Sequence, residues 1–160
     1  MRKAFAAVLI LTVILTGCGY KMKLTGMKAN FTIFPAHIDN MSEDIEVTSI
    51  FSDEINVNLS SINALGKNGR STYNGDFVLS SLTTTGASST SSTTTAYVNM
   101  KISVRLTDNK GVTVMNRVFS DSEEYSNSTS ISESRTNREE AIRNAIEKIM
   151  TDLRNAIERK

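Results

Sequence analysis

Apolar side chains recur at every third or fourth position through residues 47–65, a spacing that places them along one face of a helix. Residues 55–59 alternate apolar and polar side chains, which also fits a short strand. Because the period of about 3.6 residues persists through the longer window, we predict a helix, with Gly66 and Gly69 as stop signals. Its apolar stripe consists of Val47, Phe51, Ile55, Leu59, Ile62 and Leu65.

The C-terminal region shows the same helical spacing over a longer stretch, after a Ser-rich segment, 123–134, that we expect to be a polar connection. Residues 136–139 have the Thr-x-x-Glu pattern of a capping box, which predicts that the last helix begins there. The apolar stripe of this helix consists of Ile142, Ile146, Ile149, Leu153 and Ile157, widened by Ala145, Met150 and Ala156. Opposite charges one turn apart are expected to pair on its polar face: Glu139 with Arg143, Arg143 with Glu147, Lys148 with Asp152, and Arg154 with Glu158.

Alternating apolar and polar positions, together with β-branched residues, predict four strands. They cover residues 29–34, 76–82, 96–108 and 112–121. We expect Pro35 to end the first strand, because proline cannot donate to a strand ladder, and we expect a loop over residues 37–46.

The last two strands are joined by Asn109–Gly111, which predicts a three-residue hairpin loop because glycine readily adopts a positive φ at the last loop position. This loop places Asp108 opposite Val112. Leu106 therefore lies opposite Val114, and the register decides which side chains share a face. The face expected to meet the helices carries Met100, Ile102, Val104, Leu106, Val112, Val114 and Val118. The other face carries Tyr97, Lys101, Arg105, Met115, Arg117 and Phe119.

Residues 83–95, between the second and third strands, are almost entirely Ser and Thr. Such a tract buries little apolar surface, so we expect a mobile hairpin connection; since Thr also favours extended structure, the flanking strands running into it remain an alternative. The order strand, helix, three strands, helix predicts an α/β (α+β) two-layer sandwich. Its four-stranded mixed sheet would carry two helices on one face, with the first strand paired in parallel through the helical crossover.

The N-terminus has the layout of a bacterial secretory signal. Arg2 and Lys3 precede an apolar run that ends in Leu15-Thr16-Gly17-Cys18, a lipobox. The run is shorter than the roughly 20 residues needed to cross a bilayer, so a permanent transmembrane helix is the weaker alternative. The expected organisation is a signal peptide over 1–17, a lipidated tether over 18–28 and a single domain over 29–160.

Cys18 is the only cysteine of the chain, so no intramolecular disulfide can form. Its expected role is to carry a covalent acyl and diacylglycerol lipid, and we expect no other cofactor and no metal. Two or more acyl chains give stable membrane attachment. Gly19 rather than Asp follows the cysteine, which favours delivery to the outer membrane with the domain facing the periplasm.

Charge and composition argue against two other classes of function. Loss of Arg2 and Lys3 with the signal peptide leaves 16 basic against 17 acidic residues, whereas nucleic-acid-binding domains are usually strongly basic. His37 is the only histidine, and no histidine-based nucleophile or metal cluster is visible in the sequence. We therefore expect a protein that is not an enzyme and does not bind nucleic acid.

Several motifs along the chain are similar to those of one known family. They are Gly17-Cys18-Gly19-Tyr20, Phe31–Phe34, Val98–Leu106, Asp108–Gly111, Val118–Ser120, Glu123–Tyr125 and the long terminal helix. With these motifs, which span nearly the whole chain, the sequence resembles the LPS-assembly lipoprotein family, LptE. The resemblance implies a noncatalytic plug and assembly partner inside the LptD β-barrel, which binds lipopolysaccharide (LPS) and helps to pass it to the outer leaflet.

The resemblance also implies LPS contacts from basic positions on the sheet. Lipid A is phosphorylated and acylated, so its site should place cations beside apolar groups; arginine can hold phosphate bidentately, whereas lysine acts as a point charge. The alternative for these basic residues is that they are ordinary surface charges. The alternative for the whole protein is another periplasm-facing outer-membrane lipoprotein that acts as an assembly or secretion-system adaptor. The residues we assign to LPS binding are Lys101, Arg105 and Arg117.

Overall fold

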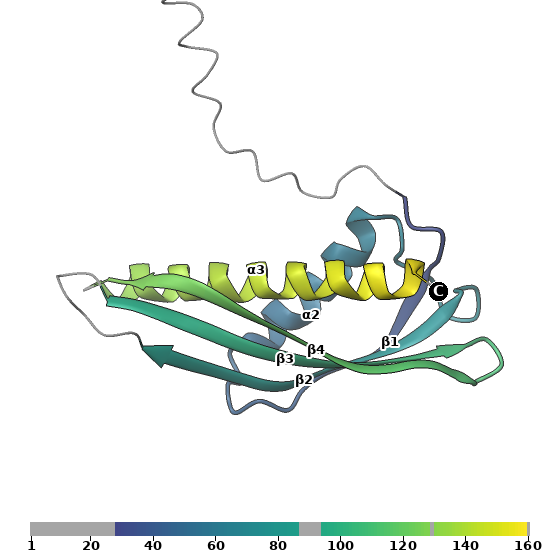
Figure 1. The fold of residues 1–160 in the computed structure, drawn as a ribbon, viewed down its shortest axis with the longest axis horizontal. Helices are drawn as coiled ribbons and strands as arrows, with labels where there is room; N and C mark the ends of the chain where they lie inside the picture. The colour runs from purple at the N-terminus through teal and green to yellow at the C-terminus, as the bar shows by residue number, and fades with distance from the viewer. Residues whose placement is uncertain (1–27, 87–93, 129, 160) are drawn as a thin grey trace, which may run out of the picture.

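The elements follow one another as strand, helix, three strands and helix in a computed structural model that describes residues 28–86, 94–128 and 130–159. The sheet order is β1-β2-β3-β4, with β1 parallel to β2 and the other pairs antiparallel. Both helices lie on one face of the sheet, which confirms the predicted sandwich (Figure 1). The bounds are β1 Ile33–Asn40, α2 Val47–Ser61, β2 Tyr73–Gly86, β3 Thr94–Asp108, β4 Thr113–Asn127 and α3 Ile131–Glu158.

Three predicted features fall wholly or partly outside the described residues. These are the signal peptide over 1–17, the tether with Cys18, of which only Lys28 is described, and the centre of the Ser/Thr tract, 87–93. The ends of that tract are described, and there β2 continues to Gly86 and β3 begins at Thr94. The flanking strands therefore run into the tract, as the alternative prediction allowed.

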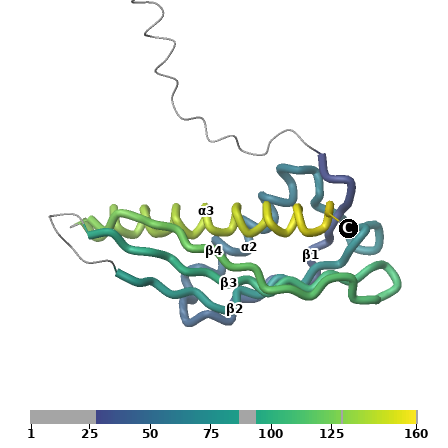
Figure 2. The backbone as a smooth tube through the Cα atoms, in the orientation of Figure 1, coloured from purple at the N-terminus to yellow at the C-terminus, as the bar shows by residue number. Residues whose placement is uncertain are grey.

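The core forms where the apolar stripes of both helices meet one face of the sheet. On α2 the buried residues are Val47, Phe51, Ile55 and Leu59, which confirms the helix over the alternating-strand interpretation. On β3 every second side chain is buried, as the strand period requires: Ala96, Val98, Met100, Ile102, Val104 and Leu106. On α3 the predicted stripe is buried from Ile142 to Leu153, and Figure 2 shows this helix lying along the length of the sheet.

α2 ends four residues earlier than the sequence predicts. Asn63 has a positive φ of 54°, and Ile33 donates a backbone hydrogen bond of 2.7 Å to the Ala64 carbonyl. The chain after Ser61 therefore pairs with the start of β1 instead of continuing the helix. Gly66 is packed against Ser71 and Ile33, so it serves a close approach of two backbones rather than a helix stop.

β1 contradicts the prediction that Pro35 ends the first strand and that 37–46 is a loop. The strand runs through Pro35 and His37 to Asn40, with an irregularity in register between Pro35 and His37. β1 lies at the edge of the sheet, where the missing N–H of a proline removes no essential ladder bond. An edge position and a bulge together allow the strand to continue.

The β3–β4 hairpin confirms the loop but not the register that the loop implied. Asp108 donates a backbone hydrogen bond of 2.9 Å to the Val112 carbonyl, and Gly111 has a φ of 81°. One extra residue in β4, Val114, then shifts the register, so Leu106 pairs with Met115. Beyond this bulge every β4 side chain lies on the face opposite to the one predicted.

β4 and α3 are both longer than predicted, and the segment 123–134 is not a simple polar connection. β4 continues to Asn127, and α3 begins at Ile131, one turn or more before the expected capping box. The Thr136 hydroxyl donates to the Ser132 carbonyl inside the helix, so it does not cap the N-terminus. The alternation along β4 continues to Tyr125, which packs against the core and explains the longer strand.

No helix in the described ranges is both long enough and apolar enough to cross a membrane.

The shifted register can be tested by truncating one side chain on each face of β4. Met115 is 6% exposed and Val118 is 62% exposed. Met115→Ala should lower the free energy of unfolding by about 2–5 kcal/mol because it leaves a cavity, whereas Val118→Ala should change it by less than about 0.5 kcal/mol. Urea unfolding of the purified protein measures both. A costly Val118→Ala with a neutral Met115→Ala would restore the register without the bulge.

Candidate functional site

The sheet surface that faces away from α2 and α3, which we call the open face, carries two of the three predicted LPS-binding residues. Lys101 and Arg105 lie four residues apart on β3, so both side chains project from this face, and both are exposed. Arg105 lies opposite Asp76 of β2, and Lys101 lies opposite Ser81 of β2 and Ser120 of β4. The face around the two cations is therefore rich in small polar groups.

The two cations differ in how freely they could meet an anion. Both Nε and Nη2 of Arg105 donate to Oδ2 of Asp76, at 2.9 and 2.6 Å. The Arg105 side chain is 58% exposed, so this ion pair adds little stability and a phosphate could compete with the carboxylate. Within the described part of the chain, no carboxylate forms an ion pair with Lys101. Lys101 is therefore the more available charge.

Arg117, the third predicted residue, lies on the opposite side of the sheet. It pairs in register with Val104, whose side chain is fully buried beneath the helices. Arg117 is itself exposed and lines a surface depression with Asp152 and Arg159, at the C-terminal end of α3. The bulge at Val114 is the physical reason, because it reverses the faces of β4. The structure thus brings Lys101 and Arg105 together and separates Arg117 from them.

The bulge also changes which apolar side chains lie beside Lys101 and Arg105 on the open face. Met115 and Phe119, predicted beside the cations, instead pack against the core. Tyr97 remains on the open face, where its hydroxyl donates a 3.2 Å hydrogen bond to Glu124. The charge of Glu124 and this hydrogen bond raise the pKa of Tyr97. Val118, 62% exposed, joins the open face, so apolar contacts there come from Tyr97 and Val118.

The helix-facing side of β4 holds a charged cluster that the sequence analysis missed. Lys148 of α3 bonds to Glu123 and lies 3.9 Å from Oδ2 of Asp121. Burial raises the pKa of Asp121, against the opposing effect of the Lys148 charge, while the hydrogen bond to Glu123 raises the pKa of Lys148. Lys148 was predicted to pair with Asp152 along the helix. Asp121 and Glu123 are two residues apart, so in an extended strand their side chains lie on the same face. This spacing was the signal in the sequence for an acidic pair on β4.

Arginines on α3 tie the two helices together instead of pairing along one helix. Arg143 bonds to Glu54 of α2 at 2.5 Å, and Arg138 bonds to Asp44 in the segment before α2. The predicted pairs of Arg143 with Glu139 and Glu147 are therefore wrong, because a partner on a packed neighbour is closer. Of the pairs expected within α3, Arg154 with Glu158 is confirmed, at 3.0 Å.

In the residues that the structure describes, no three His, Cys, Asp or Glu side chains come close enough to bind a metal ion. His37 lies on β1, with its side chain exposed at the edge of the sheet. The two sides of the sheet thus differ: one is a polar face with two cations, and the other is covered by helices linked through ion pairs.

Such a sandwich, with both helices on one face of the sheet and the other face uncovered, is a two-layer α+β domain (Figure 1). The model of the LptE family, described as lipopolysaccharide-assembly, matches residues 37–157. The chain belongs to the LptE lipopolysaccharide-assembly family.

Two solved structures also show similarity to this fold. A lipoprotein from Caulobacter crescentus CB15 is 12% identical, with a TM-score of 0.49, covering 74% of this chain and 85% of its own. A minor lipoprotein from Acinetobacter baumannii is 10% identical, with a TM-score of 0.45, covering 76% of this chain and 91% of its own. No curated protein sequence matches the chain.

The raised pKa of Asp121 makes a pH-dependent prediction. The folded protein holds the Asp121 proton more tightly than the unfolded chain does, so the bound proton adds to the free energy of unfolding. This contribution is lost as the pH rises through the pKa of Asp121 in the folded protein. Asp121→Asn mimics the protonated side chain, so it should be more stable than the wild type near pH 7. The difference should shrink below about pH 4, where the wild-type carboxyl is also protonated.

Urea unfolding of both proteins at the two pH values measures this difference. A variant that is less stable than the wild type near pH 7 would show that attraction to Lys148 outweighs the cost of burying the carboxylate.

Proposed function

We propose that the protein is a noncatalytic, lipid-anchored lipoprotein of the outer membrane that binds LPS and acts as plug and assembly partner of an LptD-type β-barrel. The observation that carries this proposal is the match of the LptE family model over residues 37–157, most of the domain. The noncatalytic part of the proposal is supported by this family, whose description is lipopolysaccharide-assembly.

The anchor in this proposal is a lipid on Cys18. The lipobox Leu15-Thr16-Gly17-Cys18 and the absence of any other cysteine support covalent attachment there, after removal of residues 1–17. Gly19 supports delivery to the outer membrane, with the domain on the periplasmic side. More than one acyl chain on the anchor would hold the domain stably at the membrane surface.

LPS recognition in this proposal belongs to the open face, through Lys101 and Arg105. Lys101 offers an unpaired charge to a phosphate, and Arg105 could exchange its bond to Asp76 for a bidentate bond to phosphate. Tyr97 and Val118 supply apolar contact on the same face. Arg117, on the helix side, would reach the ligand only as a separate contact.

The partner in this proposal is the interior of the LptD-type barrel. The open face suits such a position because its small hydroxyl and amide groups, such as Asn99, Ser120 and Ser122, can hydrogen-bond to a polar barrel wall. The alternative is an adaptor for another assembly or secretion system, which the same compact sheet could serve. Crosslinking in cells separates the two by the identity of the captured partner.

Charge reversal on the open face tests LPS binding. The double variant Lys101→Glu and Arg105→Glu should weaken LPS binding by about tenfold or more, because two charge-assisted contacts to phosphate are lost. Arg117→Glu is the comparison on the other side of the sheet. It reverses one cation where the double variant reverses two, and it should alter the affinity by less than about twofold. Titration of the purified lipoprotein with LPS gives the three dissociation constants.

A second variant separates ligand contact from damage to the fold. Asp76→Asn releases Arg105 from its ion pair, so it should strengthen LPS binding if Arg105 meets the phosphate. Equal weakening by Arg117→Glu and by the double variant would remove the open face as the LPS site, and would leave the barrel partnership untouched.

Substitution of the anchor cysteine tests the proposed localisation. Cys18→Ala removes the thiol that would carry the lipid, so the chain should be lost from the outer-membrane fraction. Mass spectrometry of the wild-type N-terminus should show Cys18 as the first residue, with acyl groups attached. An outer-membrane fraction unchanged in Cys18→Ala would contradict the anchor.

Depletion and crosslinking test the partner. Photocrosslinking from the open face in cells should capture a large LptD-type barrel, and depletion of the lipoprotein should reduce surface LPS. Capture of a different partner, with LPS export intact after depletion, would favour the adaptor alternative.

A further inference from the structure

A groove lies between α2 and α3, in the helix layer and thus on the side of the sheet opposite the open face. Its cavity volume is about 80 Å³, below the roughly 300–1,000 Å³ that is usual for ligand pockets. The groove is therefore shallow, and it suits a narrow group such as part of one alkyl chain. Most of its lining is apolar. The apolar contributors include Phe31, Ile33, Val57, Leu59, Met150 and Leu153.

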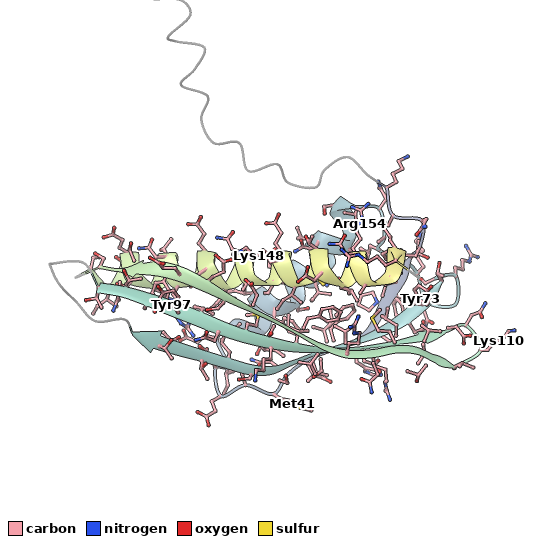
Figure 3. The ribbon with its side chains drawn as sticks, viewed as in Figure 1. Met41, Tyr73, Tyr97, Lys110, Lys148 and Arg154 are labelled. Atoms are coloured by element: carbon pink, nitrogen blue, oxygen red, sulfur yellow. The ribbon has the colours of Figure 1, made fainter. Side chains whose placement is uncertain are left out.

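Arg154 lines this groove and is the one buried charged residue among those described. Its side chain is 7% exposed, and its Nε donates to Oε1 of Glu158 at 3.0 Å. Its Nη1 is buried and has no hydrogen-bond partner in the described part of the chain. A buried charged donor is costly when it is left unsatisfied, so this atom is suited to an acceptor brought by a ligand. Figure 3 shows Arg154 on α3, toward its C-terminal end.

The remaining charges of the groove are acidic, and they set the direction in which an anion could bind. Glu147 precedes Arg154 by two turns of α3, which is about 10 Å along the helix. Glu54, on α2, is held at 2.5 Å by Arg143, which lies one turn before Glu147 on α3. An anionic group is therefore favoured at the Arg154 end of the groove and disfavoured near Glu147.

We propose that the groove binds one acyl chain of a phosphorylated lipid, with a phosphate oxygen accepting the hydrogen bond from Nη1 of Arg154. The chain would cover apolar lining residues such as Val57 and Met150. A neutral lipid would leave Nη1 unsatisfied, and free phosphate would leave the apolar lining in water. The inference rests on the proposed function, because lipid A supplies both phosphate and acyl chains, and it adds a second contact region remote from Lys101 and Arg105.

The test uses dodecyl phosphate as the probe and the full-length lipoprotein purified in digitonin, a detergent without an acyl chain. Phosphorus NMR follows binding. The wild type should bind dodecyl phosphate more tightly than inorganic phosphate, and more tightly than dodecyl maltoside measured by calorimetry. Inorganic phosphate binding equally tightly, or dodecyl maltoside binding equally tightly, would overturn the proposal.

Two substitutions at one ion pair should act in opposite directions. Arg154→Gln removes the donor charge and should weaken dodecyl phosphate binding by about tenfold. Glu158→Gln removes the internal competitor for the guanidinium and should strengthen binding severalfold. A merely structural role of the pair would weaken binding in both variants, and that result would overturn the inference. Thermal unfolding of each variant records its stability.

A matched pair of tryptophan substitutions tests the apolar part of the groove. Val57 lines the groove and is 57% exposed, whereas Val112 lies beside the hairpin loop and is 58% exposed. Val57→Trp should fill the groove and abolish binding of dodecyl phosphate, and Val112→Trp should leave it unchanged. Unimpaired binding in Val57→Trp would exclude this groove as the acyl site.

The outcome also separates this inference from the proposed function. LPS binding without any binding of dodecyl phosphate would overturn the groove site and leave the function standing. Binding of dodecyl phosphate that depends on Arg154, without binding of LPS, would support the groove site and contradict LPS recognition.

Discussion

One extra residue in β4, Val114, sets the arrangement of charge and apolar surface on both sides of the sheet. The β3–β4 hairpin loop alone would place Val118 beneath the helices; the bulge exposes Val118 and places Met115 and Phe119 against the core. The same shift moves Arg117 away from Lys101 and Arg105, and it turns Asp121 and Glu123 toward Lys148. Because side chains alternate along a strand, a one-residue change in register is sufficient to exchange the two faces.

The ion pairs of the helix layer follow from this arrangement and from the packing of α2 beside α3. Side chains expected to pair along α3 reach partners on neighbouring elements: Arg143 meets Glu54 of α2, and Lys148 meets Glu123 of β4. These pairs are partly exposed, so each contributes modestly to stability, and their main effect is to specify how α3 lies on the sheet. Apolar burial of Ile142, Ile146 and Ile149 supplies most of the stabilisation.

The two layers present different chemistry to the surroundings. The open face is polar, with exposed cations among hydroxyl and amide groups, whereas the helix layer contains an apolar groove with a single buried guanidinium, that of Arg154. The open face offers its cations to phosphate, and in our proposal the groove takes one acyl chain together with a phosphate at Arg154. The family of the chain, described as lipopolysaccharide-assembly, is the reason for proposing a phosphorylated lipid as the ligand.

The sequence by itself determined the order of elements, the helical stripes of α2 and α3, the alternation of β3 and the family, because these depend on local periodicity and on short motifs. The lipobox at Cys18 stays a prediction from the sequence, because it lies outside the described residues. Only the tertiary structure decided the continuation of β1 through Pro35, the bulge in β4 and the partners of Arg143 and Lys148. Each of these depends on which elements become neighbours in space: an edge position tolerates proline, a twisted sheet accommodates one extra residue, and a long charged side chain pairs with the nearest opposite charge across the packed layers. No local pattern in the sequence records the shift in register of β4. The sequence alone therefore grouped Arg117 with Lys101 and Arg105, and the structure separates them.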